Sequence, residues 1–143
     1  MTGATINDSQ RSFLEQVMQK ANFPDIYDAR DTTVVVFRTM RDMMPTEASD
    51  RIEAAFSNRE IAKLWRDDNA IVRLISRLRP PLKIDSEIFM RRIAQEGSVP
   101  KDVTPQGVAI AVFSTVKQEL PTEIVQEISS FLPDGVRVLW EQL

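Results

Sequence analysis

The sequence predicts an all-α fold, a compact bundle of about eight to nine helices built from two tandem repeats with pseudo-two-fold symmetry. Three observations support this prediction: apolar residues recur at helical spacing, helix-start residues precede them, and a block of sequence occurs twice. The chain has 143 residues, of which 43% are hydrophobic and 27% charged, a balance typical of a globular protein. This length suffices for a hydrophobic core, so we expect a single domain over residues 1–143.

The repeat has an offset of 76 residues, which aligns Phe37–Glu47 (FRTMRDMMPTE) with Phe113–Glu123 (FSTVKQELPTE). The same offset gives ten identical residues among the 44 positions from 13 to 56. Near the end the register slips by one, so that Leu64-Trp65 corresponds to Leu139-Trp140. We therefore predict repeat one at about 9–67, a connector at 68–84 and repeat two at about 85–143.

Helix-start signals occur at corresponding places in the two repeats. Ser9 corresponds to Asp85, and Asp28 corresponds to Thr104, which Pro105 follows at a favourable first helical position. A proline before Thr-Glu then ends one helix and opens the next in each repeat. The predicted helices, in chain order, are 9–21, 28–44, 46–56, 58–67, 70–78, 86–97, 105–119, 122–131 and 134–142.

The second helix of each repeat carries the clearest apolar stripe. Its members follow an i, i+3, i+4, i+7, i+11 spacing: Thr33, Val36, Phe37, Met40 and Met44, with Ala109, Val112, Phe113, Val116 and Leu120 in the other repeat. We expect these two helices to be the most buried. Thr39 and Thr115 are expected to bond back to the preceding turn, although a polar pair between the repeats is the alternative. Trp65 and Trp140 are expected to close the bundle ends rather than to serve as exposed binding anchors.

The repeated pattern Phe-x-Thr, then Pro-Thr-Glu, then Leu-Trp resembles a bacterial domain-of-unknown-function family of small duplicated all-helical proteins. In that family a Phe-Leu-x-x-Val helix opens each copy, as Phe13–Val17 does here and Phe89–Ile93 does with substitutions. The resemblance covers roughly residues 12–143 and implies the fold without implying a chemistry. The arginine-rich segment Arg66–Lys83 departs from the pattern.

Composition excludes several chemistries. The chain has no cysteine and no histidine, which removes thiolate chemistry, the commonest general base and the commonest transition-metal ligand. A catalytic base would have to come from a lysine beside a serine or from an unusual carboxylate. Asp25, Asp28 and Asp31 lack the layout of a calcium loop and are expected to complement a helix start. We therefore predict no cofactor, no metal site and no enzyme, with an unrecognised carboxylate-based enzyme as the third alternative.

The N-terminus lacks the layout of a signal peptide, and no apolar run is long enough to span a membrane. We therefore expect a cytoplasmic protein of a bacterium-like cell.

Basic residues gather in one part of the chain. Nine basic and five acidic residues lie between Arg59 and Arg92, although the whole chain has a net charge of −3. Arg73 and Arg77 fall on the face of the predicted helix 70–78 that is opposite its apolar residues. A solvated connector is one interpretation. The other is a docking surface that includes Arg66, Arg73, Arg77 and Arg79.

We accordingly expect a non-enzymatic adaptor or assembly factor that binds a protein with an acidic surface. A regulator that docks on nucleic acid or an anionic membrane through Arg66–Arg92 is the alternative, and nucleic acid is the less favoured partner because the chain is acidic overall.

Overall fold

The computed structural model describes residues 8–66 and 80–142, which form eight α-helices, one 3₁₀-helix and no strand. The all-helical fold class is therefore confirmed. The first half contains α1 (Asp8–Ala21), α2 (Ile26–Asp42), α3 (Thr46–Ala55) and α4 (Arg59–Arg66). The second contains α6 (Ser86–Glu96), α7 (Pro105–Val116), η1 (Lys117–Glu119), α8 (Thr122–Phe131) and α9 (Asp134–Glu141). The predicted helix 70–78 lies outside the described residues.

Several predicted boundaries were wrong, most of them by one residue, and the larger differences are in α2 and α7. Helix α2 ends at Asp42 rather than at 44, and α1 begins at Asp8, so Ser9 lies within its first turn rather than at its start. The second helix begins at Ile26 rather than at 28, because the carboxylate of Asp25 accepts a hydrogen bond from Asp28 N (2.8 Å) and caps the helix there. The helix predicted over 105–119 ends at Val116, and its last turn tightens into the 3₁₀-helix before Leu120 becomes extended. Asp85 and Thr104 cap α6 and α7 as expected.

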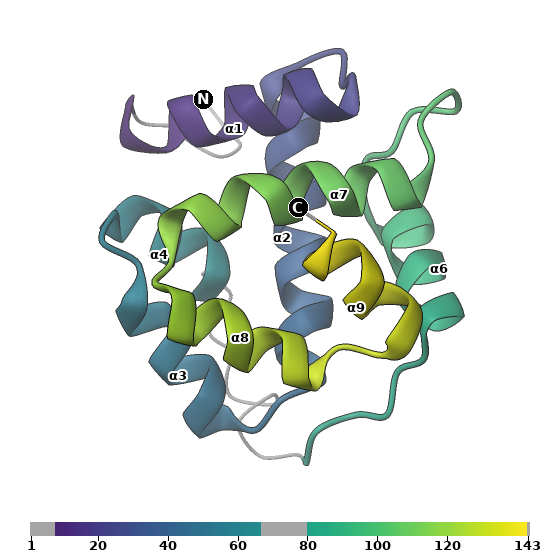
Figure 1. Ribbon diagram of the computed structural model, residues 1–143. Coiled ribbons are helices and arrows are strands. Elements are labelled where there is room, and N and C mark those ends of the chain that lie inside the picture. The colour runs from purple at the N-terminus through teal and green to yellow at the C-terminus, as the bar shows by residue number, and fades with distance from the viewer. Residues whose placement is uncertain (1–7, 67–79, 143) are drawn as a thin grey trace.

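The two halves are interlocked through their first helices. Helices α2 and α7 contact each other in the middle of the molecule, and the other helices surround them (Figure 1). Helix α1 packs on α2 of its own half and on α7 of the other half, and α6 packs on α7 and on α2 in the same way. Because α1 and α6 each pack on both halves, each half covers part of the other half's core.

The core is continuous across both halves. Of the ten stripe residues, Leu120 is half-buried and the other nine are buried. The six at the centre of the core have exposures of 0–1%: Val36, Phe37, Met40, Val112, Phe113 and Val116. Phe37 lies between Phe13 and Trp65, with ring centroids 6.5 and 5.4 Å away. Phe113 lies likewise between Phe89 and Trp140, at 6.2 and 5.1 Å. These tilted and edge-on aromatic contacts add to the stabilisation from burial itself.

Buried polar groups make corresponding hydrogen bonds in the two halves. The indole N–H of Trp65 donates to Ser49 O (3.1 Å), and that of Trp140 donates to Val125 O (3.0 Å). The hydroxyls of Thr39 and Thr115 donate to the carbonyls four residues earlier, at 2.8 and 2.7 Å. The expected bond of each threonine to the preceding turn is therefore confirmed. Both tryptophans are buried rather than exposed as binding anchors. The matched contacts support the duplication, which stays an inference from the sequence.

Ion pairs join the halves within the described residues. Arg51 on α3 pairs with Glu127 on α8, and these two residues occupy the same position under the 76-residue offset. Arg92 on α6 pairs with the buried carboxylate of Asp42 at the end of α2, at 3.0 Å. Among the described residues, no helix is both long and apolar enough to cross a bilayer.

Candidate functional site

Of the four arginines predicted to bind a partner, the structure describes one. Arg66 is the last residue of α4, where its carbonyl accepts a hydrogen bond from Arg41 (2.7 Å) and its guanidinium lies 4.0 Å from Glu53. Arg73, Arg77 and Arg79 lie outside the described residues. The described part of the candidate surface therefore consists of the residues near Arg66 on α4 and on the neighbouring helix α2.

Helix α2 carries a basic stripe next to α4. Arg30 and Arg38 lie eight residues apart, with Val34 midway between them, so all three face within an arc of about 80°. The side of α2 that carries Val36 and Phe37 is fully buried, and the stripe is left partly exposed. These arginines are not among the residues predicted to bind a partner, although their i, i+8 spacing about Val34, in a helix otherwise rich in buried residues, was a usable signal.

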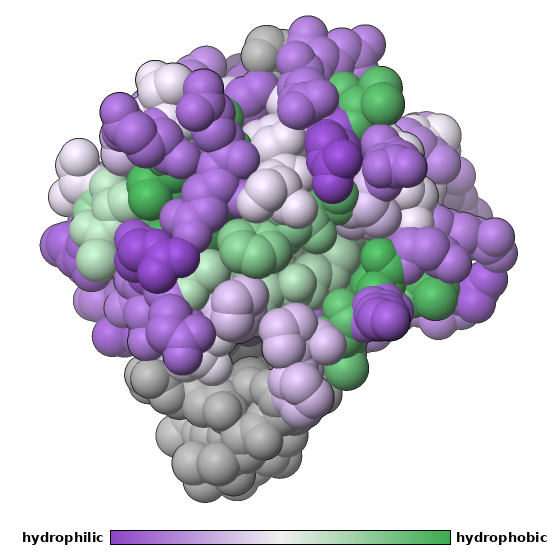
Figure 2. Space-filling view, turned by 60° about the horizontal axis from the view of Figure 1, so that its bottom comes forward, coloured by the Kyte–Doolittle hydropathy of each residue, from purple (hydrophilic) through white to green (hydrophobic). Residues whose placement is uncertain are grey.

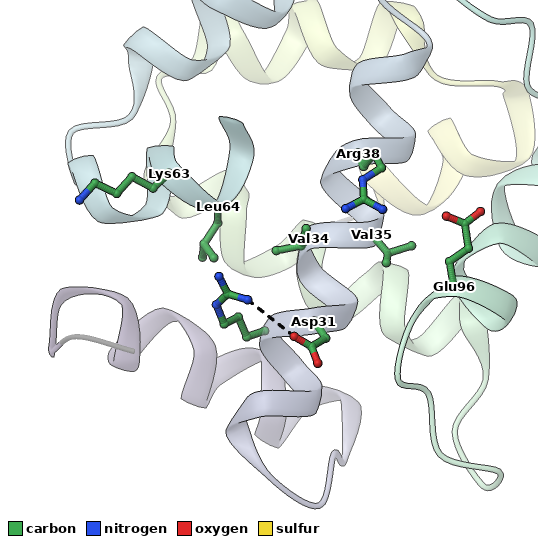
Figure 3. A pocket seen from close by; sticks show the side chains of 8 residues that line it. Asp31, Val34, Val35, Arg38, Lys63, Leu64 and Glu96 are labelled. Carbon is green, nitrogen blue, oxygen red and sulfur yellow. Dashed lines mark ion pairs between the residues drawn. The ribbon is translucent and has the colours of Figure 1, made fainter. Parts of the chain in front are cut away.

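The stripe forms the centre of a surface pocket of about 330 Å³, which we call the charged pocket (Figure 3). Helix α4 lies on one side of α2 with Lys63 and Leu64, and the end of α6 lies on the other with Glu96. Three cations, two carboxylates and three aliphatic residues line it: Arg30, Arg38 and Lys63; Asp31 and Glu96; Val34, Val35 and Leu64. Val34 is half-buried between the two arginines, and Val35 and Leu64 are buried, so the pocket contains a small aliphatic patch among charged groups.

Several charged groups of the pocket are ion-paired. Asp31 lies 3.6 Å from Arg30, and Glu96 lies 3.4 Å from Arg92. Lys63 pairs with Glu60 one turn earlier on α4, at 3.1 Å. The Nε of Arg30 is buried and has no hydrogen-bond partner.

The matched positions in the second half have a different chemistry. Under the 76-residue offset, Arg30, Arg38 and Glu96 correspond to Gln106, Ser114 and Lys20. Lys20 of α1 bridges to α7 through hydrogen bonds to Ser114 Oγ and Thr115 Oγ1, both 3.1 Å. The charged pocket is thus a feature of the first half, not of the shared repeat pattern.

A second hollow lies at the end of the molecule that is lowest in Figure 1 and faces the viewer in Figure 2. It is a shallow groove of about 900 Å³ between the segment before α6 and the turn from α8 to α9. Apolar surface gathers in the middle of this face, with polar surface around it (Figure 2). The groove's apolar residues include Leu82, which is 38% exposed, and Phe131, which is half-buried.

The acidic residues at the start of α2 serve the helix. Asp25 provides the cap, and Asp28 stands in the first turn. Partial burial, together with the charges of Asp25 and Asp31, raises the pKa of Asp28 above its ordinary value. No group of residues in the described part of the chain has the composition of a metal site.

Serine–lysine pairs, which the sequence analysis did not identify, occur at two places with Ser-x-x-Lys spacing: Ser98–Lys101 and Ser114–Lys117. Burial lowers the pKa of Lys117, but its ammonium donates to Trp140 O (2.5 Å) and lies over the Trp140 ring. The hydroxyl of Ser114 donates to Ala111 O (3.2 Å) and accepts from Lys20. A serine activated by a lysine would instead give its proton to that lysine. These contacts tie helices together.

The fold and the pocket define the class of this protein: a small helical bundle with a charged surface pocket on one of its two central helices. The chain belongs to the family described as uncharacterized conserved protein (DUF2267), which matches residues 10–139. The expected membership of a domain-of-unknown-function family is thereby confirmed. Comparison with curated proteins finds no match to the chain.

Proposed function

We propose that this protein is a non-enzymatic adaptor or assembly factor that binds an acidic protein through the charged pocket and the adjoining end of α4. One observation carries the proposal: Arg30, Arg38 and Lys63, which come from two helices, line one surface pocket with an aliphatic centre. The cations would pair with carboxylates of the partner, and the centre would be covered by an apolar side chain. The proposal places this activity in the cytoplasm of a bacterial cell.

The mixture of charges favours a protein over a polyanion. Asp31 and Glu96 line the same pocket as the cations, so a continuous row of phosphates would meet both carboxylates. A protein surface, by contrast, can place acidic and basic side chains opposite the pocket's own charges. The net charge of −3 also gives the whole molecule no attraction to nucleic acid.

The side chains in and near the pocket support a binding role rather than catalysis. Both carboxylates are engaged with arginines, and the pocket opens on the surface between helices. Catalysis generally requires groups that converge on a reacting atom in a water-excluding site.

Affinity capture from the native cell tests the proposal. The protein and an Arg30→Gln/Arg38→Gln/Lys63→Gln variant would be used as baits, with Arg11→Gln/Arg91→Gln/Lys101→Gln as a matched control. The control removes the same charge from exposed residues outside the pocket. Circular dichroism and thermal unfolding would establish that all three baits are folded.

We expect an acidic protein that the wild-type and control baits retain in a salt-sensitive manner and that the pocket variant loses. Equal retention by all three baits would contradict the proposal. Retention of nucleic acid or anionic lipid in place of a protein would favour the alternative regulator.

A further inference from the structure

We propose that the partner presents an amphipathic α-helix to the charged pocket, with two acidic residues seven or eight positions apart and an apolar residue midway between them. This inference rests on the proposed function and specifies the structure that the pocket recognises. It follows from the spacing of charges on α2, the position of Val34 and the different charges of the two flanking helices.

The spacing comes from the geometry of α2. Eight residues at 1.5 Å per residue place the Cα atoms of Arg30 and Arg38 about 12 Å apart along the helix axis. A second helix running alongside α2 reaches both guanidinium groups when its own acidic residues are separated by the same two turns. On the partner helix, two residues seven positions apart lie on almost the same face. Two residues eight positions apart differ in direction by about 80°, as Arg30 and Arg38 do on α2.

The centre of the pocket provides the apolar contact. Val34 is half-buried and lies midway between the two arginines, and Leu64 of α4 stands beside it. An apolar side chain midway between the two acidic residues would cover Val34. The pocket volume of about 330 Å³ suits one or two side chains of a helix lying across its mouth rather than a whole folded segment.

A helix suits this surface better than an extended peptide. All the elements around the pocket are helices, and they offer no sheet edge to which an extended backbone could bond. The backbone groups of an extended peptide would be left without partners where it covers the apolar centre. A helix satisfies its backbone internally and needs only side-chain contacts.

The two walls differ in charge, which gives the bound helix an orientation. Lys63 lies on the α4 side of the pocket, and Glu96 lies on the α6 side (Figure 3). The acidic residues of the partner helix would therefore lean toward α4, and a lysine or arginine would suit the side toward α6. The uncharged Gln106 and Ser114 at the matched positions of α7 offer no such recognition.

Synthetic peptides test the inference with the whole protein. Two fluorescent, alanine-rich helical peptides of identical composition would each carry two glutamates and one leucine. In the matched peptide the glutamates stand at i and i+7 with leucine at i+4. In the mismatched peptide they stand at i and i+5, which points them about 140° apart. Fluorescence anisotropy would give both dissociation constants, and methyl NMR would follow Val34 and Leu64.

We expect the matched peptide to bind about tenfold more tightly than the mismatched one and to shift the Val34 and Leu64 methyl signals. Arg30→Gln/Arg38→Gln should remove the difference, while Arg11→Gln/Arg91→Gln should keep it. If the double variant fails to fold, Arg30→Gln alone should still reduce the difference.

Equal binding of the two peptides, or a preference that survives loss of Arg30 and Arg38, would overturn the helix inference. So would a proline-interrupted acidic peptide that binds as tightly as the matched helix. In those cases a captured acidic protein that still depends on the pocket would leave the proposed function standing. Failure of the proposed function would be seen in the capture experiment, as equal retention of the acidic protein by all three baits.

Discussion

Arg91 and Arg92 are neighbours on α6, but their guanidinium groups meet different surroundings. Arg91 pairs with the exposed Glu87 one turn earlier on its own helix. Arg92 reaches the other half and pairs with Asp42, whose side chain is only 4% exposed. Asp42 also stands at the C-terminal end of α2, where the helix dipole disfavours a negative charge.

We therefore expect Arg92→Met to destabilise the protein by about 2 kcal/mol, because it leaves a buried carboxylate without this partner. Arg91→Met is the matched control and should change stability by no more than about 0.5 kcal/mol. Urea unfolding followed by circular dichroism measures both values. Equal effects of the two substitutions would mean that the Asp42 pair contributes nothing beyond an exposed ion pair.

At the scale of the element, α2 and α7 carry the centre of the core through Phe37 and Phe113. Both rings are fully buried, and each contacts two other aromatic rings. Phe37→Ala or Phe113→Ala should destabilise the protein by about 3–5 kcal/mol, since each leaves a large cavity. Val138→Ala on α9, at a side chain that is 63% exposed, should stay within about 0.5 kcal/mol. A decrease in the free energy of unfolding of less than 1 kcal/mol for both phenylalanine variants would contradict the central position of these helices.

Periodicity predicted the helices well because each has a buried face. The bounds of α8, 122–131, coincide with the prediction. The start of α2 could not be chosen from spacing alone, because Asp25 and Asp28 are both acceptable caps and the choice depends on backbone conformation. The end of α7 likewise depends on a local change to 3₁₀ geometry that the apolar pattern does not encode.

The candidate site was harder to predict than the fold. Three of the four arginines proposed from the sequence, Arg73, Arg77 and Arg79, lie outside the described residues. Arg30 and Arg38 do not stand out in the sequence, because a charged stripe on an amphipathic helix usually faces only solvent. Their meeting with Leu64 and Glu96 results from contacts of α2 with α4 and α6. Such contacts between distant segments are not visible in one sequence.

At the scale of the whole molecule, α1 and α6 each pack on both halves, so the two halves should unfold in a single cooperative transition. Each half contains one buried tryptophan, so Trp65→Phe leaves Trp140 as the reporter and Trp140→Phe leaves Trp65. In each variant the tryptophan fluorescence and far-UV circular dichroism should give the same urea midpoint. Separate midpoints within either variant would show that the halves unfold independently.

The pairing of Arg51 with Glu127 has a consequence for how such a chain could arise. These residues occupy matched positions on α3 and α8 and meet each other. In a homodimer of identical single repeats, the residue at this position would face its own copy, so an arginine would face an arginine and a glutamate a glutamate. Opposite charges at one self-facing position require two genes or one fused gene. Under the duplication inferred from the sequence, a single fused gene would let the two matched positions differ, as Arg51 and Glu127 do and as Arg38 and Ser114 do.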